Sequence, residues 1–253
     1  MTLEWLRQIA EAVGERRGWD FSRTRDDRDP VSWDYLEVAC RYLRPSDRVL
    51  DVGTGGGERF LSLAPHFGLG VGIDASAAMV QVARENTPAE LLDKMTYEVM
   101  LGEKLRFGDG DFDVVLNRHA PICPAEVARV LKPDGLFITQ QVGPRNTEAF
   151  CQAFGCQPGG SYAPEQGQEL DEVALAFGNL GCAVEARGEY NVRYYFLDLE
   201  SFVFWLKAIP MPEDFDVERH WQQVDELVRH HWTPRGLESN EHRQLLVVRK
   251  ARQ

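Results

Sequence analysis

The stretch VLDVGTGGGERF, residues 49–60, is the part of this chain best suited to hold a small-molecule cofactor. An apolar run ends at Asp51, and four of the five residues after Val52 are glycine. The run predicts a buried strand and residues 57–66 a helix, so the glycines form the turn between them. Such a turn gathers backbone N–H groups and the positive end of a helix dipole, which suits a ligand group that is negatively charged or accepts hydrogen bonds. The stretch therefore predicts a nucleotide-like cofactor.

Two classes of cofactor compete for this turn. A dinucleotide-binding fingerprint needs a third Gly or Ala three residues after the second glycine, so that the helix can pack close to the strand. This chain has Glu58 at that position, where the carboxylate would also repel a pyrophosphate. The residues disfavour NAD or FAD, although a lone glycine pattern is a weak signal and a turn without any ligand is the plainer alternative.

The stretch also matches the pattern Asp-x-Gly-x-Gly-x-Gly through Asp51, Gly53, Gly55 and Gly57. It thereby resembles the first motif of the class I S-adenosylmethionine-dependent methyltransferases. The resemblance implies S-adenosylmethionine as the cofactor, with the loop, Thr54 included, around its methionyl part. That part carries an ammonium, a carboxylate and a sulfonium but no phosphate, so an acidic strand end beside the turn suits it.

Further stretches resemble the later motifs of that family in the same order. GVGIDASAAMVQVARE places Asp74 at the end of a second strand, where a carboxylate can accept hydrogen bonds from ribose hydroxyls in either cofactor class. GEKLRFGDGDFDVVLNRH resembles the third and fourth motifs, and VLKPDGLFITQQ resembles the helix, turn and strand after them. The resemblance covers about residues 48–142 and is to the small-molecule group of types 11 and 25.

The resemblance implies further cofactor contacts. Besides the loop and Asp74 these are Ala75, Met79, Gly102, Glu103 and Asn117. Many relatives have an aspartate two residues before the position of Glu103, where it contacts the adenine amino group, whereas this chain has Leu101. Adenine recognition then rests on backbone groups around Gly102 and Glu103 and on apolar stacking, or Glu103 takes the role.

Residues 117–121, just beyond the fourth strand, face the methyl group in members of the family. Methyl transfer from a sulfonium is an in-line displacement, so positioning of the acceptor supplies much of the catalysis. A base is needed only for a protonated acceptor, and His119, which can titrate near neutral pH, is the candidate. The alternative is a histidine that only shapes the pocket. The Asn/Asp-Pro-Pro-Tyr motif of amino-directed nucleic-acid methyltransferases does not follow this strand.

Aromatic residues outside the sheet-forming part of the chain are candidates for the substrate pocket, although most of them are expected to be ordinary core. In this family the N-terminal helices and the insertion before the last strand form a lid, and aromatic lids exclude water and favour a sulfonium cation. We therefore expect a mostly apolar pocket for a small-molecule acceptor, lined by His119, Phe21, Trp33 and Trp205. Trp33 is preferred over Tyr35 as the residue that faces it.

The elements that must position these residues follow from hydrophobic periodicity. Apolar runs alternate with helical segments between residues 47 and 142, which predicts a doubly wound α/β fold. The expected strands there are 48–52, 70–74, 96–101, 112–117 and 135–142, and the expected helices are 57–66, 76–86 and 124–131. Elsewhere we expect helices at 3–13, 32–43, 169–180, 199–208 and 216–231, and strands at 183–195 and 242–250. The last strand is antiparallel.

These elements predict a seven-stranded, mostly parallel, Rossmann-like sheet with an α-helical cap. The expected division is a cap of residues 1–45 and a methyltransferase domain of residues 46–253, with a helical lid insertion at about 196–235. Ser32 is the expected N-cap of the second helix. The Gly/Pro/Gln-rich residues 155–168 are the best candidate for a mobile loop.

Composition limits the class of partner. With 253 residues and 43% hydrophobic content, the chain can bury a sizeable core in one domain with an elaboration, or in two small domains. A net charge of -12 argues against an extended nucleic-acid surface. Arginines between residues 16 and 28 keep an rRNA base methyltransferase open as an alternative. A further alternative is a protein that binds S-adenosylmethionine without turnover.

Other side chains indicate neither a metal site nor a disulfide framework. The five cysteines are irregularly spaced without a CxxC pair. His220 and His230 lie about three turns apart on an expected helix, so we predict surface residues rather than metal ligands. The N-terminus does not read as a signal peptide, and no stretch of about 18 apolar residues occurs. We therefore expect a cytoplasmic protein with no membrane partner, as a monomer or a homodimer.

Overall fold

The computed structural model describes residues 1–14, 20–157, 169–209, 211–212 and 214–252. Most of the expected mobile loop at 155–168 lies outside these residues. The chain forms two compact units. The first, which we call the helical unit, comprises Met1–Val31, Gly143–Gly167 and Tyr190–His242. The second, which we call the sheet unit, comprises Ser32–Val142, Gln168–Glu189 and Arg243–Gln253.

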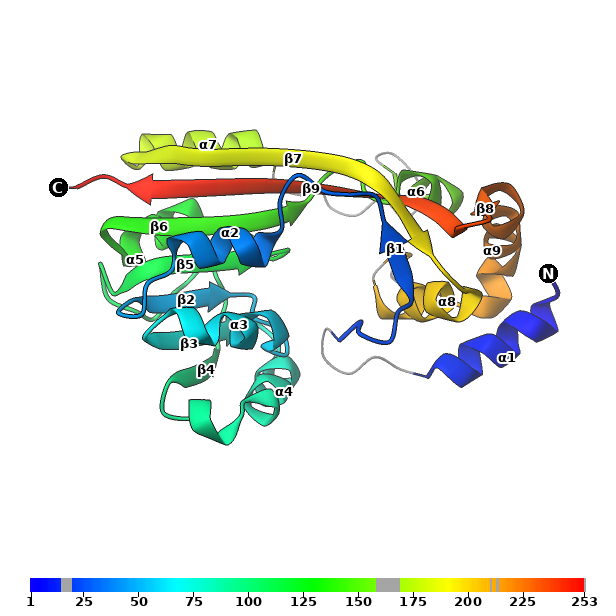
Figure 1. Cartoon of the computed structure of the whole chain (residues 1–253), viewed down its shortest axis with the longest axis horizontal. Coiled ribbons are helices and arrows are strands. Elements are labelled where there is room, and N and C mark those ends of the chain that lie inside the picture. The colour runs from blue at the N-terminus through cyan, green and yellow to red at the C-terminus, as the bar shows by residue number, and fades with distance from the viewer. Residues whose placement is uncertain (15–19, 158–168, 210, 213, 253) are drawn as a thin grey trace. The chain divides into compact units, whose positions relative to one another are not determined.

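The sheet unit is built on a mostly parallel sheet (Figure 1). Its strands are β2 (Arg48–Val52), β3 (Leu69–Asp74), β4 (Met95–Val99), β5 (Phe112–Arg118), β6 (Leu131–Val142), the first part of β7 (Cys182–Phe196) and the last part of β9 (Gly236–Lys250). The strand order is β7-β9-β6-β5-β2-β3-β4. Neighbours from β6 to β4 pair in parallel, and β9 pairs antiparallel with β6. The predicted mostly parallel sheet with a final antiparallel strand is confirmed, and each of the seven expected strands is present.

Two short strands in the helical unit extend this sheet beyond the seven that were predicted. Strand β1 (Asp26–Arg28) pairs antiparallel with the end of β7, and β8 (Trp232–Thr233) pairs antiparallel with the start of β9. Strands of three and two residues are too short to show an alternating pattern, so the sequence does not predict them.

Helices cover both faces of the sheet in the sheet unit, as a doubly wound fold requires. They are α2 (Tyr35–Tyr42), α3 (Glu58–Leu63), α4 (Ala77–Asn86), α5 (Pro124–Val130) and α7 (Leu170–Asn179), with single 3-10 turns at Ala64–His66 and Ala89–Leu91. One hydrophobic core joins α2, α3 and α4 to the sheet, and a second joins α5 and α7 to it. Strands β2, β5 and β6 contribute side chains to both cores.

Helix α2 differs from the prediction in its start and in the unit that it joins. Asp34, not Ser32, is its N-cap, because the Asp34 carboxylate accepts hydrogen bonds from the N–H groups of Leu36 and Glu37. Both residue types cap helices well, so the sequence alone did not separate them. The apolar side of α2 is part of a sheet-unit core, and the helix therefore does not group with the N-terminal residues 1–31 as the expected cap of residues 1–45 would require.

The helices of the helical unit are α1 (Leu3–Val13), α6 (Glu148–Ala153), α8 (Leu199–Ala208) and α9 (Val217–His231), and they pack around a core rich in phenylalanine. His220 on α9 is part of that interior at 4% exposure, and its ring stacks on Phe215 with centroids 5.7 Å apart. The prediction of a surface position for His220 was wrong. Phe154, which is distant in sequence, and Phe215, which lies just before α9, both pack against its ring.

No helix within the described ranges combines the length and the apolar content needed to cross a membrane. Within those same ranges, no three or more His, Cys, Asp or Glu side chains gather into a group that could hold a metal ion.

Candidate functional site

The glycine loop between β2 and α3 is held by its own hydrogen bonds. Gly53, Gly55 and Gly57 have φ angles of 75°, 57° and 79°, which glycine adopts without strain. The N–H groups of Gly53 and Thr54 donate to the carbonyl of Ile73 at 2.9 Å, and that of Gly57 donates to Thr54 at 3.0 Å. These amides are therefore already used, in contrast to the expected cluster of free N–H groups. A Cβ at Gly53 would also overlap the Cβ of Ala120.

Asp74, the last residue of β3, connects this loop to the next strand. One carboxylate oxygen accepts from the Gly55 N–H and the other from the Ser76 N–H, each at 2.9 Å. A carboxylate has about four acceptor positions, so positions remain for two hydroxyl groups of a ligand. Ala75, which follows Asp74 directly, is exposed. Met79, in the first turn of α4, is half-buried. The predicted ribose acceptor and its two neighbours thus lie at the edge of the glycine loop.

Asp51 is a buried carboxyl group in β2, close to the carboxyl end of the strand. Burial raises its pKa to about 7, while the Thr54 hydroxyl and the Arg118 guanidinium act in the opposite direction and the Asp74 charge adds to the rise. Near neutral pH this carboxyl group is therefore close to half protonated. A cation placed beside it would favour its charged form.

Glu58 begins α3, and its carboxylate folds back over the glycine loop. A Cβ at Gly56 would overlap the Glu58 carboxylate, so the loop passes directly beneath it. The Oε1 atom is buried and has no hydrogen-bond partner among the residues that the structure describes. An unsatisfied carboxylate oxygen at this place suits a positively charged group and opposes a phosphate.

The loop after β4 meets the loops after β2 and β5. A Cβ at Gly102 would lie 3.0 Å from Val52 Cγ1 and 3.9 Å from the carbonyl of Pro121. Leu101 is 59% exposed and Glu103 is also exposed. The predicted adenine contacts therefore border the end of β2 and are open to solvent.

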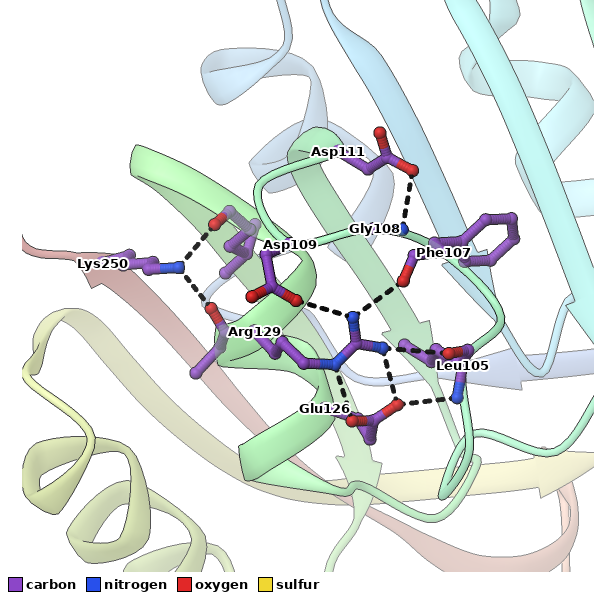
Figure 2. A network of polar contacts seen from close by, with 10 residues as sticks. Leu105, Phe107, Gly108, Asp109, Asp111, Glu126, Arg129 and Lys250 are labelled. Atoms are coloured by element: carbon purple, nitrogen blue, oxygen red, sulfur yellow. Dashed lines mark hydrogen bonds and ion pairs between the residues drawn. The ribbon is translucent and has the colours of Figure 1, made fainter.

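An arginine on α5 fixes the continuation of this loop (Figure 2). The Arg129 guanidinium donates to the carbonyls of Leu105 and Phe107 at 2.9 and 2.7 Å, and to the Asp109 carboxylate at 3.0 Å. It also donates to both carboxylate oxygens of Glu126, which in turn accepts from the Leu105 N–H at 2.7 Å. The hydrogen bonds from Arg129 hold the pKa of Glu126 below its usual range. The sequence reading missed this pair, whose only sequence signal is a Glu and an Arg three residues apart.

His119 follows β5 in a left-handed conformation with φ of 60°, which is uncommon outside glycine. Its N–H donates to the carbonyl of Gln140 at 3.0 Å, and its Nε2 lies 3.0 Å from the Gln140 side-chain nitrogen. An amide nitrogen donates, so Nε2 accepts and the neutral ring carries its proton on Nδ1. The nitrogen that a general base would use is therefore occupied by Gln140.

The pKa of His119 lies well below its ordinary value. Surrounding protein atoms lower it first, and the positive charges of Arg118, Arg243 and Arg59 lower it further. More than a third of the residue is exposed to solvent, so burial accounts for less of the lowered pKa than the three guanidinium charges do. His119 is therefore neutral at physiological pH.

Asn117 is buried two residues before His119, and its side chain serves the turn that carries His119. Its carbonyl oxygen accepts from Thr139 Oγ1 at 3.1 Å and from Gln141 Nε2 at 2.7 Å. Its amide donates to the Pro121 carbonyl at 3.2 Å. These bonds join the ends of β5 and β6, and they occupy the carbonyl oxygen that a cofactor contact would otherwise share.

Comparison with known proteins identifies the domain that one stretch of the chain forms. Residues 50–139 match a family model described as a methyltransferase domain. The chain carries a class I S-adenosylmethionine-dependent methyltransferase domain. This confirms the resemblance drawn from its motifs. A domain of this family is an enzyme domain.

Named relatives cover the same part of the chain. The uncharacterized methyltransferase YcgJ of Bacillus subtilis is 34% identical over 110 residues, which are 41% of this chain and 44% of YcgJ. The demethylmenaquinone methyltransferase of Symbiobacterium thermophilum is 35% identical over 42% of this chain and 47% of that protein. A phthiotriol/phenolphthiotriol dimycocerosates methyltransferase of Mycobacterium tuberculosis is 31% identical over 53% of this chain and 46% of that protein. The matches span less than half the length of these relatives.

The solved structure of YcgJ is similar over a longer region. Its TM-score is 0.61 at 22% identity, and the similarity covers 87% of this chain and 98% of YcgJ. At this identity the similarity shows the class I methyltransferase fold.

The four substrate candidates are divided between the two units. Trp33 belongs to the sheet unit, half-buried before α2 rather than on it, and a Cβ at Gly188 would lie 2.7 Å from its Nε1. Phe21 and Trp205 are partly buried and pack against the core of the helical unit, and the Phe21 ring lies edge-on to Phe204 with centroids 6.1 Å apart. Of the four, Trp33 and His119 therefore lie in the same unit.

Tyr35 approaches the predicted cofactor residues through its hydroxyl group. The side chain is buried, and burial together with the nearby Asp51 carboxylate raises its pKa, while Arg118 and the backbone of Asn117 act against the rise. The Tyr35 hydroxyl is buried and has no hydrogen-bond partner among the residues that the structure describes. The preference for Trp33 over Tyr35 as the residue that faces the pocket stays a prediction.

Proposed function

We propose that the chain binds S-adenosylmethionine at the carboxyl ends of β2, β3 and β5 and transfers its methyl group to a small-molecule acceptor. The hydrogen bond from the Gly55 N–H to Asp74 carries this proposal, because it holds a carboxylate beside the glycine loop. An acidic residue at this place suits the hydroxyl groups of a ribose. The methyltransferase domain over residues 50–139 supports the same assignment.

Carboxyl groups around the loop favour a cation over a phosphate. The buried Oε1 of Glu58 suits the ammonium of the cofactor's methionyl part, and Asp51 lies on the neighbouring strand end. Gly102 and Glu103 are assigned to the adenine, while the other predicted contacts are Ala75, Met79 and Asn117. Of these, Asn117 acts mainly by holding the turn that carries His119.

The chain's own residues supply binding and orientation rather than covalent chemistry. S-adenosylmethionine brings a methyl group on a sulfonium, and the methyl acceptor must be held in line with it. His119, neutral and bonded to Gln140 through Nε2, is placed to position the acceptor. It takes a proton from a protonated acceptor only when that bond is exchanged.

The nature of the acceptor and of the compartment is inferred from weaker signals. Two relatives are named for small-molecule acceptors, demethylmenaquinone and phthiotriol dimycocerosates, which supports a small molecule here. All five cysteines are free thiols, which suits a reducing cytoplasm. We assign the protein to the cytoplasm as a monomer or a homodimer.

The test is calorimetric titration of the protein with S-adenosylmethionine, followed by transfer of a labelled methyl group to a panel of metabolites. The Asp74→Asn variant should bind the cofactor more weakly, whereas Asp93→Asn, an exposed aspartate of the same unit, should not. Absence of binding in the unaltered protein would refute the function. Binding without transfer to any acceptor would favour a protein that uses the cofactor without turnover.

A further inference from the structure

The side chain of Asn86 reaches the glycine loop from the last position of α4. Its amide donates to the Gly56 carbonyl at 2.9 Å, although the two residues lie 30 positions apart in the sequence. The N–H of the next residue, Gly57, donates to the Thr54 carbonyl at 3.0 Å. Both ends of the peptide group between Gly56 and Gly57 are therefore held, one by the loop itself and the other by Asn86.

This peptide group needs such support because it joins two glycines. Glycine adopts positive and negative φ angles about equally readily, so a peptide group between two glycines can turn over with little steric resistance. Gly57 has a φ of 79° in the structure. The bond from Asn86 fixes the direction of the Gly56 carbonyl, just as Asp74 fixes the Gly55 N–H from the strand end before α4.

The space behind Gly57 is filled by the side chains of α4 and β4. A Cβ at Gly57 would lie 3.2 Å from the Ala83 Cβ and 3.3 Å from the Tyr97 hydroxyl oxygen. Both of these residues are buried. The loop as a whole is therefore supported from behind, and turning of the peptide group is the movement that Asn86 opposes.

Asn86 itself lies outside the core. Its side chain is exposed, whereas the buried residues of α4 are Val80 and Ala83. Truncation of Asn86 therefore removes its hydrogen bond to the loop and leaves the apolar packing of α4 in place. The residue can be tested without loss of the fold.

We propose that Asn86 is a positioning residue for the cofactor. By holding the Gly56 carbonyl, it keeps the glycine loop in the shape that binds the methionyl part of S-adenosylmethionine. A loop that is ordered before the ligand arrives does not have to be ordered by binding, and the affinity is higher for that reason. This inference rests on the proposed function, because it concerns the same site.

The test compares S-adenosylhomocysteine with 5′-methylthioadenosine, which lacks the amino-acid part. NMR titration measures both affinities, including weak ones. In Asn86→Ala, the affinity for S-adenosylhomocysteine should fall about three- to tenfold, the effect of one lost hydrogen bond, while that for 5′-methylthioadenosine should stay the same. General damage to the fold would lower both affinities in proportion. An unchanged ratio of the two affinities would overturn the proposal.

Further variants separate the hydrogen bond from effects on the helix. Asn86→Asp keeps the shape of the side chain but cannot donate when it is ionised, so it should lower the ratio as Asn86→Ala does. Gln81→Ala and Gln81→Glu are the matched controls, because the exposed Gln81 amide of the same helix donates to Glu85 and not to the loop. Equal effects of the Gln81 and Asn86 variants would assign the change to α4 as a whole and contradict the proposal.

A readout without ligand distinguishes this proposal from the proposed function. Hydrogen exchange of the Gly57 N–H should be at least about threefold faster in Asn86→Ala than in Gln81→Ala, because the peptide group turns more freely. Equal exchange rates would refute the role of Asn86. If the unaltered protein does not bind S-adenosylhomocysteine, the proposed function fails, and the exchange rates still decide whether Asn86 holds the loop.

Discussion

The carboxylate of Asp74 and the backbone N–H of Gly55 are joined by a hydrogen bond of 2.9 Å, so the end of β3 directly holds the glycine loop that follows β2. We expect Asp74→Ala to weaken binding of S-adenosylmethionine by about 1–3 kcal/mol, because polar groups of the ribose lose their acceptor. Calorimetric titration measures this, with Asp93→Ala as the control. An unchanged affinity would remove Asp74 from the ribose role.

The left-handed glycines of the loop should not tolerate side chains. Gly53→Ala places a methyl group against Ala120 at a φ of 75°, and we expect it to lower the free energy of unfolding by about 1–3 kcal/mol and to weaken cofactor binding. Gly178→Ala is the matched control, because its added methyl group meets nothing within 4 Å on α7 and alanine favours a helix. If both variants unfold at the same denaturant concentration as the unaltered protein, the strain argument is wrong.

Asp51 should release protons when the cationic cofactor binds. Its pKa of about 7 leaves it partly protonated near neutral pH, and a nearby sulfonium would lower that pKa. Calorimetric titrations at pH 7 in two buffers with different heats of ionisation should therefore give different binding enthalpies. Asp51→Asn should abolish the difference. Equal enthalpies in the unaltered protein would show that Asp51 does not respond to the ligand.

The same group makes stability depend on pH in the absence of cofactor. Its folded-state pKa is raised above the ordinary value of 3.8, so the folded protein binds the proton more tightly than the unfolded chain. The free energy of unfolding should then fall as pH rises from about 4 to about 7. Denaturant unfolding at several pH values should show a smaller fall in Asp51→Asn.

Arg129 should matter more than its place on a helix surface suggests. Arg129→Ala leaves two backbone carbonyls without their side-chain donor and removes the hydrogen bonds from Arg129 to Glu126, and we expect a loss of about 1–3 kcal/mol in stability. Arg129→Lys should recover little, because one ammonium cannot reach all these acceptors. Denaturant unfolding measures both variants. Arg106→Ala, which breaks an exposed pair, should stay within about 0.5 kcal/mol of the unaltered protein.

A second readout tests whether Arg129 positions the loop after β4, in which Gly102 and Glu103 are assigned to the adenine. The ratio of affinities for S-adenosylhomocysteine and S-inosylhomocysteine should fall in Arg129→Ala, because the two ligands differ only in the base. A constant ratio would limit Arg129 to a structural role.

Trp33 and Tyr35 should differ in what their truncation costs. Tyr35, the first residue of α2, is 5% exposed and is part of the core between α2 and the sheet, so Tyr35→Ala should cost about 3–5 kcal/mol of stability. Trp33 is half-buried, and Trp33→Ala should cost less. Melting temperatures and cofactor affinity of the folded fraction, measured together, decide whether either ring also serves the ligand. A larger loss for Trp33 than for Tyr35 would contradict this reading.

The sequence by itself determined the sheet and the glycine loop. Strand β5 and helix α4 follow from periodicities that neighbouring residues set, and the loop follows from glycines at positions where φ is positive. Asp74 could be placed at a strand end for the same reason. These features depend on interactions within a few residues, so they can be predicted from a single sequence.

The tertiary structure decided what depends on distant partners. Arg129 binds backbone carbonyls, which every residue possesses, so no residue type marks its acceptors. Strand register puts Arg118 opposite Gln140, and His220 is buried by contacts such as that with Phe154, which helical spacing cannot reveal. In each case the deciding interaction joins segments that only folding brings into contact.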